Sequence, residues 1–240
     1  MNPETQTPDG AAGRTSHEAT ARGAAPASGL SLVLWAGLGL LLALFTGVLL
    51  MAVVQGRSAA GARLPVYGSV GNFTLTNQDG AAVSLSDLQG HVWVVDIIFT
   101  RCPGPCLRMT RQMKELQQAL PEASQARLVS LTTDPDFDNP SVLKSYAGRF
   151  GADLRRWVFL TGTKKQIAGL AIDSLKLTAI EKAPADRQSP EDLFVHSTIL
   201  VLVDRAARLR GIFETMGEGV DAERVKGQVV RAVRQLEREP

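Results

Sequence analysis

The chain has 240 residues, an aromatic content of 5% and a formal net charge of +2, from 26 basic and 24 acidic residues. This balance, with no basic stripe or series of stacking aromatic residues evident along the sequence, argues against a nucleic-acid-binding protein. With two cysteines and three histidines, the chain offers few residues for thiol or soft-metal chemistry.

The N-terminal part of the chain divides into a tail and an apolar segment. Residues 1–27 are rich in Ala, Gly, Thr and Pro and show no hydrophobic period, which predicts a disordered tail. Residues 30–54 carry no charge, and such a run is long enough to cross a bilayer as a helix. A cleavable signal peptide normally has an apolar region of about 7–15 residues behind a short basic start. We therefore expect an uncleaved membrane anchor.

The anchor leads into a single globular domain. Arginines flank the apolar segment evenly on its two sides, so the charge bias leaves its orientation open. Residues 55–64 predict a short flexible linker. Residues 65–240 have a normal length for one globular domain.

The first elements of this domain are a hairpin, a buried strand and a helix. Residues 72–90 predict the hairpin, with Asp79-Gly80 as its turn. Residues 92–100 are almost continuously apolar, which is typical of a strand buried on both faces of a parallel sheet. Apolar residues then recur at spacings of three and four from Cys106 to Leu120, which predicts a helix.

Further strands and helices alternate up to a closing pair of strands and a last helix. The expected strands are residues 126–133, 157–162, 196–204 and 208–214. The expected helices run from Asn139-Pro140 to about residue 150, from Thr163 to about residue 177, and over 221–239, with a Pro- and charge-rich loop at 178–195. This order predicts an α/β, thioredoxin-like fold with an N-terminal β-hairpin extension, preceded by one transmembrane helix.

Cys102 and Cys106 lie four residues apart at the expected junction between a strand and a helix. Residues at this spacing share one face of a helix, with about 5–6 Å between their Cβ atoms. Pro103 and Pro105 fit the first helical turn, where a missing N–H costs little. A helix N-terminus lowers the pKa of a thiol, so we expect a preformed, low-pKa pair. Such a pair forms a disulfide, exchanges one with a partner, or binds a soft metal.

A purely structural disulfide is the simplest alternative for the pair. It is disfavoured because so short a loop constrains the unfolded chain only slightly. The pair also follows the expected central strand, at the edge where open α/β sheets bind ligands.

His196 is the best candidate for a third metal ligand. His196 begins the expected strand 196–204, and if that strand runs antiparallel to its neighbour, the central strand, His196 lies at the same sheet edge as the cysteines. His17 falls in the tail, and His91 precedes the central strand at its opposite end. Two thiolates and one imidazole suit copper as Cu(I) or Cu(II), whereas structural zinc usually has a fourth protein ligand. The spacing of Met109 and Met113 favours core packing over metal binding.

Three segments of the chain resemble the SCO/SenC family of copper proteins: VWVVDIIFTRCPGPC, TTDPDFDNP and VHSTILVLVD. The resemblance covers most of residues 66–238, and the family consists of membrane-tethered thioredoxin-fold domains. It implies that Cys102, Cys106 and His196 bind one copper ion per domain, and that the two cysteines are the redox-active pair if thiol exchange occurs.

The same resemblance implies a location and partners. The domain is expected outside the cytoplasm, and the Ala-, Gly- and Arg-rich composition favours a bacterial periplasm. Its expected task is to deliver copper to, or reduce the cysteines of, the binuclear copper site in cytochrome c oxidase subunit II. Another copper chaperone or a thiol–disulfide oxidoreductase is a further expected partner.

The chain departs from the family at three positions near the expected ligands. Leu107 stands where the family often has proline, and Gly104 and Val195 stand where it often has acidic residues. Lost carboxylates are expected to affect copper affinity or partner choice, because groups around a metal's ligands tune the site. Asp134 and Asp138 match a turn motif of the family, and cap or turn duty is the favoured interpretation for both.

Other functions remain as alternatives. A metal-independent thiol–disulfide oxidoreductase is the main one. Thioredoxins have two residues between their cysteines and a cis-proline opposite them, whereas this chain has three residues between its cysteines and no proline in VHST. A thiol peroxidase is disfavoured because Phe99 stands where a threonine is usual, three residues before the reactive cysteine. A non-catalytic interaction domain would leave the paired thiols and His196 unexplained.

Overall fold

The computed structural model describes residues 29–61, 63–102, 104–187 and 193–239, without the side chains of residues 29–32, 52–61, 179, 195 and 196. The chain forms two compact units, Met1–Ala62 and Arg63–Pro240. The predicted disordered tail, residues 1–27, lies outside the described residues.

The first unit contains one long helix, α1 (Gly29–Gly61). Its stretch Val33–Met51 is long and apolar enough to cross a membrane, and its large apolar side chains are exposed. The predicted flexible linker, residues 55–64, is wrong over most of its length, because the helix continues to Gly61. Alanine and arginine are good helix formers, so a helix already nucleated in the apolar segment extends through them.

The second unit is built on an eight-stranded mixed sheet with the order β1-β10-β9-β4-β5-β6-β2-β3. Its strands are β1 (Gly68–Ser69), β2 (Thr74–Asn77), β3 (Ala82–Ser84), β4 (Trp93–Ile98), β5 (Arg127–Thr132), β6 (Trp157–Thr161), β9 (Ile199–Val203) and β10 (Arg208–Glu214). Strands β4, β5 and β6 are parallel, whereas β9 runs antiparallel to β4. This arrangement confirms the predicted thioredoxin-like fold, with β2 and β3 as the N-terminal hairpin.

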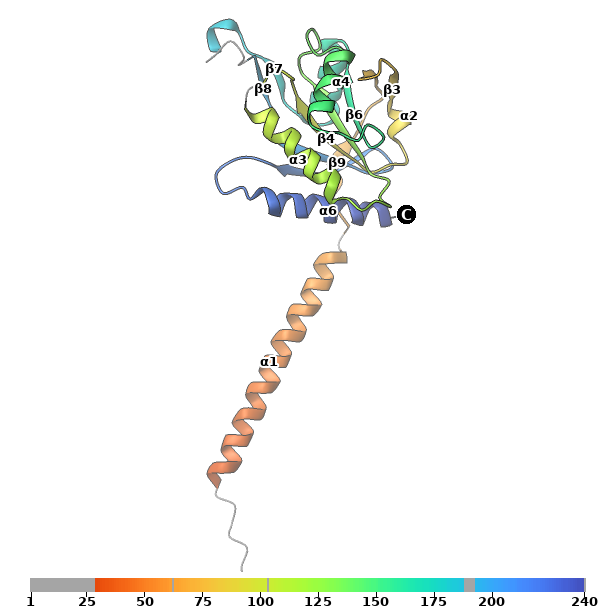
Figure 1. Ribbon diagram of the computed structural model, residues 1–240. Helices are drawn as coiled ribbons and strands as arrows, with labels where there is room; N and C mark the ends of the chain where they lie inside the picture. Colours follow the sequence, from red (N-terminus) through yellow and green to blue (C-terminus); the bar gives the residue numbers. More distant parts are fainter. Residues whose placement is uncertain (1–28, 62, 103, 188–192, 240) are drawn as a thin grey trace, which may run out of the picture. The chain divides into compact units, whose positions relative to one another are not determined.

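Helices cover both faces of this sheet. The helices on one face are α3 (Pro105–Ala119), α4 (Pro140–Arg149) and α6 (Ala222–Arg238) (Figure 1). On the other face lie α2 (Leu85–Leu88), α5 (Lys164–Ala168) and the π-helical stretch η1 (Gly169–Ser174). Every residue of β4 is buried, and alternate residues enter the two cores: Val94 and Ile98 on the α3 side, Val95 and Ile97 on the other. The continuous apolar pattern of this strand reflects that double burial.

Local signals placed several element ends correctly. Asn139 caps α4 by accepting a hydrogen bond from the Val142 amide, and Thr163 caps α5. The β2–β3 turn contains Gly80 at φ 79°, a left-handed conformation that glycine adopts without strain. The helix after Thr163 becomes π-helical at Gly169 and ends at Ser174, before the predicted limit.

The expected loop at 178–195 is partly wrong. Strands β7 (Ala179–Glu181) and β8 (Phe194–His196) form a separate antiparallel hairpin, in which Ala179 pairs with His196. The strand predicted to begin at His196 therefore begins at Ile199 instead. Neither strand of the hairpin has a long apolar run, and three residues are too few to show a hydrophobic period.

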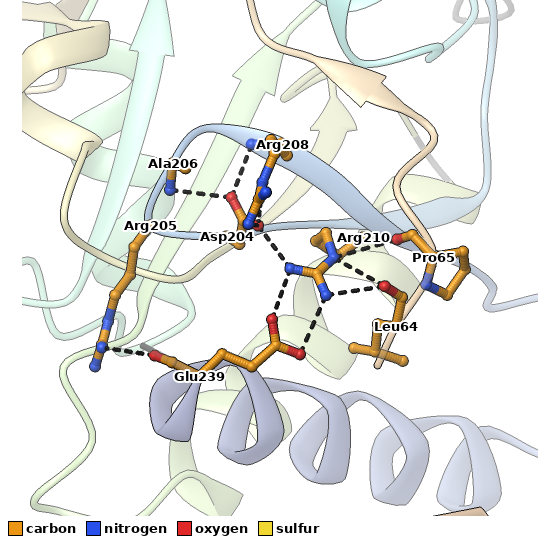
Figure 2. Close-up of polar contacts among 8 residues, drawn as sticks. All are labelled: Leu64, Pro65, Asp204, Arg205, Ala206, Arg208, Arg210 and Glu239. Carbon is orange, nitrogen blue, oxygen red and sulfur yellow. Dashed lines mark hydrogen bonds and ion pairs between the residues drawn. The ribbon is translucent and has the colours of Figure 1, made fainter. Parts of the chain in front are cut away.

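A buried arginine joins the two ends of the second unit (Figure 2). The guanidinium of Arg210, on β10, donates to the carbonyl oxygens of Leu64 and Pro65. It also pairs with the carboxylates of Asp204 and of Glu239, at the end of α6. The first residues of the unit are thus held beside its last helix.

Candidate metal centre

The two cysteines lie where β4 gives way to α3. The chain turns after β4, and the Cys102 amide donates to the Phe99 carbonyl at 3.2 Å. Pro105 begins α3, which puts Cys106 in its first turn. Cys102 is 5% exposed and Cys106 is 0% exposed, and both are thiols, not halves of a disulfide. The pair is therefore preformed, as predicted, but deeply set.

Burial changes the acidity expected for Cys106. Two effects raise the pKa of Cys106 above the ordinary thiol value: the larger is a hydrogen bond with the Cys102 thiol, and the second is burial. The Phe99 amide, which donates to the Cys106 Sγ at 3.4 Å, works in the opposite direction and is outweighed. The prediction of a low pKa is wrong for this thiol, because the hydrogen bond with Cys102 and the loss of water on burial both favour the neutral thiol over the thiolate.

Asp138 anchors the loop that carries Cys102. Its carboxylate accepts hydrogen bonds from the Thr100 amide at 3.0 Å, from the Thr100 hydroxyl, and from the Thr132 hydroxyl at 2.5 Å. Burial raises the pKa of Asp138, while these donors lower it by a smaller amount. The carboxyl group thus ties the segment before Cys102 to the end of the neighbouring strand β5.

Asp134 makes a second connection to the same loop. Its carboxylate accepts a hydrogen bond from the Arg101 Nε at 3.1 Å, and the Arg101 guanidinium lies 4.2 Å from the centre of the Phe137 ring. The Asp138 amide donates to the Asp134 carbonyl, so the expected turn is present. The interpretation of Asp134 as a turn residue was therefore incomplete, because its side chain also binds the cysteine loop through Arg101. The carboxyl ends of parallel strands share one sheet edge, which is the signal that both acids would meet the cysteine loop.

Asp96 is a buried acid that the sequence analysis did not single out. It lies on β4 at 0% exposure, and its Oδ1 accepts a hydrogen bond from the Ser130 hydroxyl at 2.5 Å. The Trp157 indole donates to the same hydroxyl at 2.9 Å. The charge of Asp96 is a minor contribution to the raised pKa of Cys106. A lone acid inside an apolar strand was the available signal.

His196 is the last residue of β8, and its side chain lies outside the described part of the structure. The backbone nearby is well placed relative to the cysteine loop. The rings of Phe194 and Phe99 are 5.2 Å apart, and both belong to the core cluster that contains Cys102 and Cys106. Strand β9 starts three residues later and runs antiparallel to β4, as predicted from the thioredoxin order.

The other sulfur and imidazole groups have structural surroundings. Met109 and Met113 are 0% exposed in the core, which confirms the packing interpretation. His91 is half-buried before β4, with its Nδ1 3.0 Å from the Gln125 carbonyl. Met216 packs partly buried against the core cluster of the cysteines. His17 lies outside the described residues.

The donor set suits a soft cation. Two thiols already in mutual contact, held between a buried strand and a helix, fit the preference of soft metals for sulfur ligands. Among the described residues, no group of three His, Cys, Asp or Glu side chains could hold a metal ion.

Comparison with known proteins agrees with this fold and motif. The sequence model of the SCO1/SenC family matches residues 65–234. The chain belongs to the SCO1/SenC family. A SCO1 protein homolog of Bacillus subtilis is 39% identical over 141 residues, which cover 58% of this chain and 70% of the relative.

Solved structures of other SCO1/SenC proteins superpose on most of this chain. A SCO1/SenC family lipoprotein from Bacillus anthracis is 27% identical with a TM-score of 0.61, and the match covers 73% of this chain and 99% of that one. BsSco, described as a member of the Sco family of cytochrome c oxidase assembly proteins with a disulfide switch, is 30% identical with a TM-score of 0.59. That match covers 72% of this chain and 98% of BsSco.

Proposed function

We propose that this chain is a copper metallochaperone that acts in the assembly of cytochrome c oxidase, on the binuclear copper site of subunit II. The observation that carries the proposal is the pair of adjacent buried thiols at the β4–α3 junction. BsSco is described as belonging to a family of cytochrome c oxidase assembly proteins. A relative from Stutzerimonas stutzeri, 29% identical over 150 residues, is named as an inferred copper-binding protein.

Cys102, Cys106 and His196 are the proposed ligands of one copper ion. Strand residues two apart share a face, so positions 194 and 196 of β8 lie on the same side of the hairpin. The Phe194 ring is in contact with Phe99, three residues before Cys102. This placement supports His196 as the third ligand, because Phe194 of the same strand belongs to the core cluster that contains Cys102 and Cys106. Two sulfurs and one imidazole nitrogen suit either Cu(I) or Cu(II).

Copper binding and thiol redox state are coupled in this proposal. The ion takes both sulfurs as thiolates, so binding releases the thiol protons, and joining the sulfurs in a disulfide removes both ligands. If the pair instead reduces the cysteines of subunit II, the two thiols lose two protons and two electrons. The disulfide of the partner gains them and becomes two thiols.

The proposed location is a membrane with the copper-binding domain, residues 65–240, on the extracytoplasmic side. Helix α1 supplies a candidate anchor near the N-terminus. Delivery to an oxidase subunit on the outer side of a bacterial membrane requires the domain in the periplasm.

A metal-independent thiol–disulfide oxidoreductase is the second candidate. The contact between the two thiols favours it, since a disulfide can form with little rearrangement. Cys102 is the more exposed sulfur and would attack the partner's disulfide, after which Cys106 would resolve the mixed disulfide.

Anaerobic copper binding by the full chain in detergent tests the proposal. We expect the reduced protein to bind one copper ion and the oxidised protein to bind none. His196→Ala should weaken binding on the order of ten-fold or more, with His91→Ala as the matched histidine control. Failure of the reduced protein to bind copper would contradict the proposal and favour the oxidoreductase. Unchanged binding in His196→Ala would remove His196 from the ligand set.

A further inference from the structure

Helix α6 presents a face of arginines to solvent. Arg224, Arg231, Arg234 and Arg238 are all exposed, and their spacings of seven, three and four place them along one side of the helix. We refer to these four residues as the α6 arginine face. The opposite side packs into the core through Val225, Val229, Ala232, Val233 and Leu236. This basic face is not evident along the sequence, because the chain is nearly neutral overall and the four arginines are not consecutive.

The acids of α6 do not neutralise this face. Glu237 accepts hydrogen bonds from the Ser124 hydroxyl and the Gln125 amide, and Glu239 pairs with Arg210 (Figure 2). Glu223 pairs with Lys226. Within the described residues, none of the four arginine side chains makes an ion pair or hydrogen bond. The acidic side chains of α6 therefore have partners within the domain, whereas the four guanidinium groups face the solvent.

The end of α6 also lies beside the point where the chain enters the domain. Arg210 binds both the carbonyl oxygens of Leu64 and Pro65 and the carboxylate of Glu239 (Figure 2). The apolar stretch that could span a membrane ends at Met51, only a short length of chain before Leu64. A bilayer that holds this stretch is therefore within reach of the domain by chain length alone.

We propose that the α6 arginine face binds the anionic surface of the bilayer in which α1 is anchored. This inference rests on the proposed membrane anchor and not on the copper site. Guanidinium groups bind phosphate oxygens in a bidentate manner, and phospholipid headgroups present many of them. Each arginine near an anionic membrane surface strengthens binding by about five-fold. The anchor makes docking intramolecular, so even a weak surface interaction holds the domain on the membrane.

Arginine footprinting of the full chain in lipid nanodiscs tests the proposal. The rate of phenylglyoxal modification is measured by mass spectrometry in phosphatidylcholine discs and in discs that also contain phosphatidylglycerol. We expect modification of the α6 arginine face to slow by about five-fold or more in the anionic discs. Arg108 and Arg155, which are exposed elsewhere, should react at the same rate in both. The protection should vanish at about 1 M salt, where the Debye length is roughly 3 Å.

Matched variants separate this surface from net charge. Arg231→Gln with Arg238→Gln should abolish the protection of Arg224 and Arg234, since glutamine keeps the helix but removes the charge. Lys165→Gln with Lys176→Gln removes the same charge elsewhere and should leave the protection intact. Equal modification rates in the two lipids would overturn the proposal. Protection that is equal in both lipids and grows with protein concentration would overturn it in favour of a second copy of the chain.

Discussion

Arg210 is a buried residue whose side chain contacts several segments of the second unit. Its side chain is 3% exposed and is surrounded by acceptors from three parts of the chain: Asp204 after β9, Glu239 at the end of α6, and the carbonyl oxygens of Leu64 and Pro65 (Figure 2). A buried charge is tolerated only when it is paired and hydrogen-bonded. The contacts with Leu64, Pro65 and Glu239 connect segments that are far apart in the sequence, whereas Asp204 lies only six residues before Arg210.

Replacement of Arg210 by methionine should destabilise the protein strongly. The change keeps the length of the side chain but leaves the carboxylate of Glu239 without its cation, whereas Asp204 keeps its ion pair with Arg208. The carbonyl oxygens of Leu64 and Pro65 also lose their donor, so we expect a loss of about 3–5 kcal/mol in the free energy of unfolding. Urea denaturation followed by circular dichroism measures it. Arg155→Met is the matched control, because Arg155 pairs with Asp153 at 88% side-chain exposure and should cost less than about 1 kcal/mol. Equal losses in the two variants would contradict the role assigned to Arg210.

At the same scale, the cysteine loop shows how neighbours set the chemistry of a residue. Cys106 has the helix N-terminus that favours a thiolate, yet its contact with Cys102 and its burial raise its pKa. Asp134 and Asp138 looked like turn residues, yet their carboxylates hold the segment that carries Cys102. In each case the residue type was noticed in the sequence, but its partners come from other elements.

Among the elements, α4 illustrates a boundary that is encoded locally. Asn139 adopts an extended conformation before the helix and its side chain accepts from the Val142 amide at 3.1 Å, while Pro140 occupies the first helical position. Proline is well suited there because its fixed φ matches the helix and no N–H is needed. These signals lie within a few residues of one another, so the start of the helix could be predicted.

Loss of this cap should have a moderate cost. Asn139→Ala removes the acceptor for an unpaired amide of the first turn, so we expect about 1 kcal/mol less stability. Thermal unfolding measures the effect, and Asn139→Asp, which keeps an oxygen acceptor, should stay close to the original protein. A loss in the aspartate variant as large as in the alanine variant would show that capping is not the reason.

The β7–β8 hairpin is the contrasting element. Its strands are only three residues each and pair with one another outside the main sheet. So short a pair is not stable by itself and depends on packing, here through Phe194 against Phe99. A period of two cannot be recognised in three residues, which is why the sequence indicated a loop and placed His196 in the wrong strand.

For the whole molecule, two units of opposite character share one chain. Unit Arg63–Pro240 buries its apolar side chains in two cores, one on each face of the sheet. Helix α1 exposes its large apolar side chains along Val33–Met51. Exposed apolar surface of this extent needs a lipid or protein partner, and the bilayer is the partner that fits its length.

Removal of the first unit should change how the protein partitions. In cloud-point separation with a non-ionic detergent, we expect the full chain in the detergent phase because α1 enters the micelles. A chain that begins at Arg63 should stay in the aqueous phase and keep the circular dichroism of its folded sheet. A full chain in the aqueous phase would argue against a membrane anchor.

The sequence by itself determined the features that depend on near neighbours: the apolar segment that became α1, the buried strand β4, the helical stripe of α3, the caps of α4 and α5, and the pairing of two cysteines four residues apart. It also determined the family, because three motifs and their order were enough to recognise it. Only the tertiary structure decided the burial and acidity of Cys106, the reach of Asp134 and Asp138 to the cysteine loop, the hairpin that ends at His196, and the segregation of charge on α6. These four features depend on which segments, distant in the sequence, the sheet brings together. Where the contacts between such segments exclude water, as at Cys106, burial also changes the pKa of the side chain.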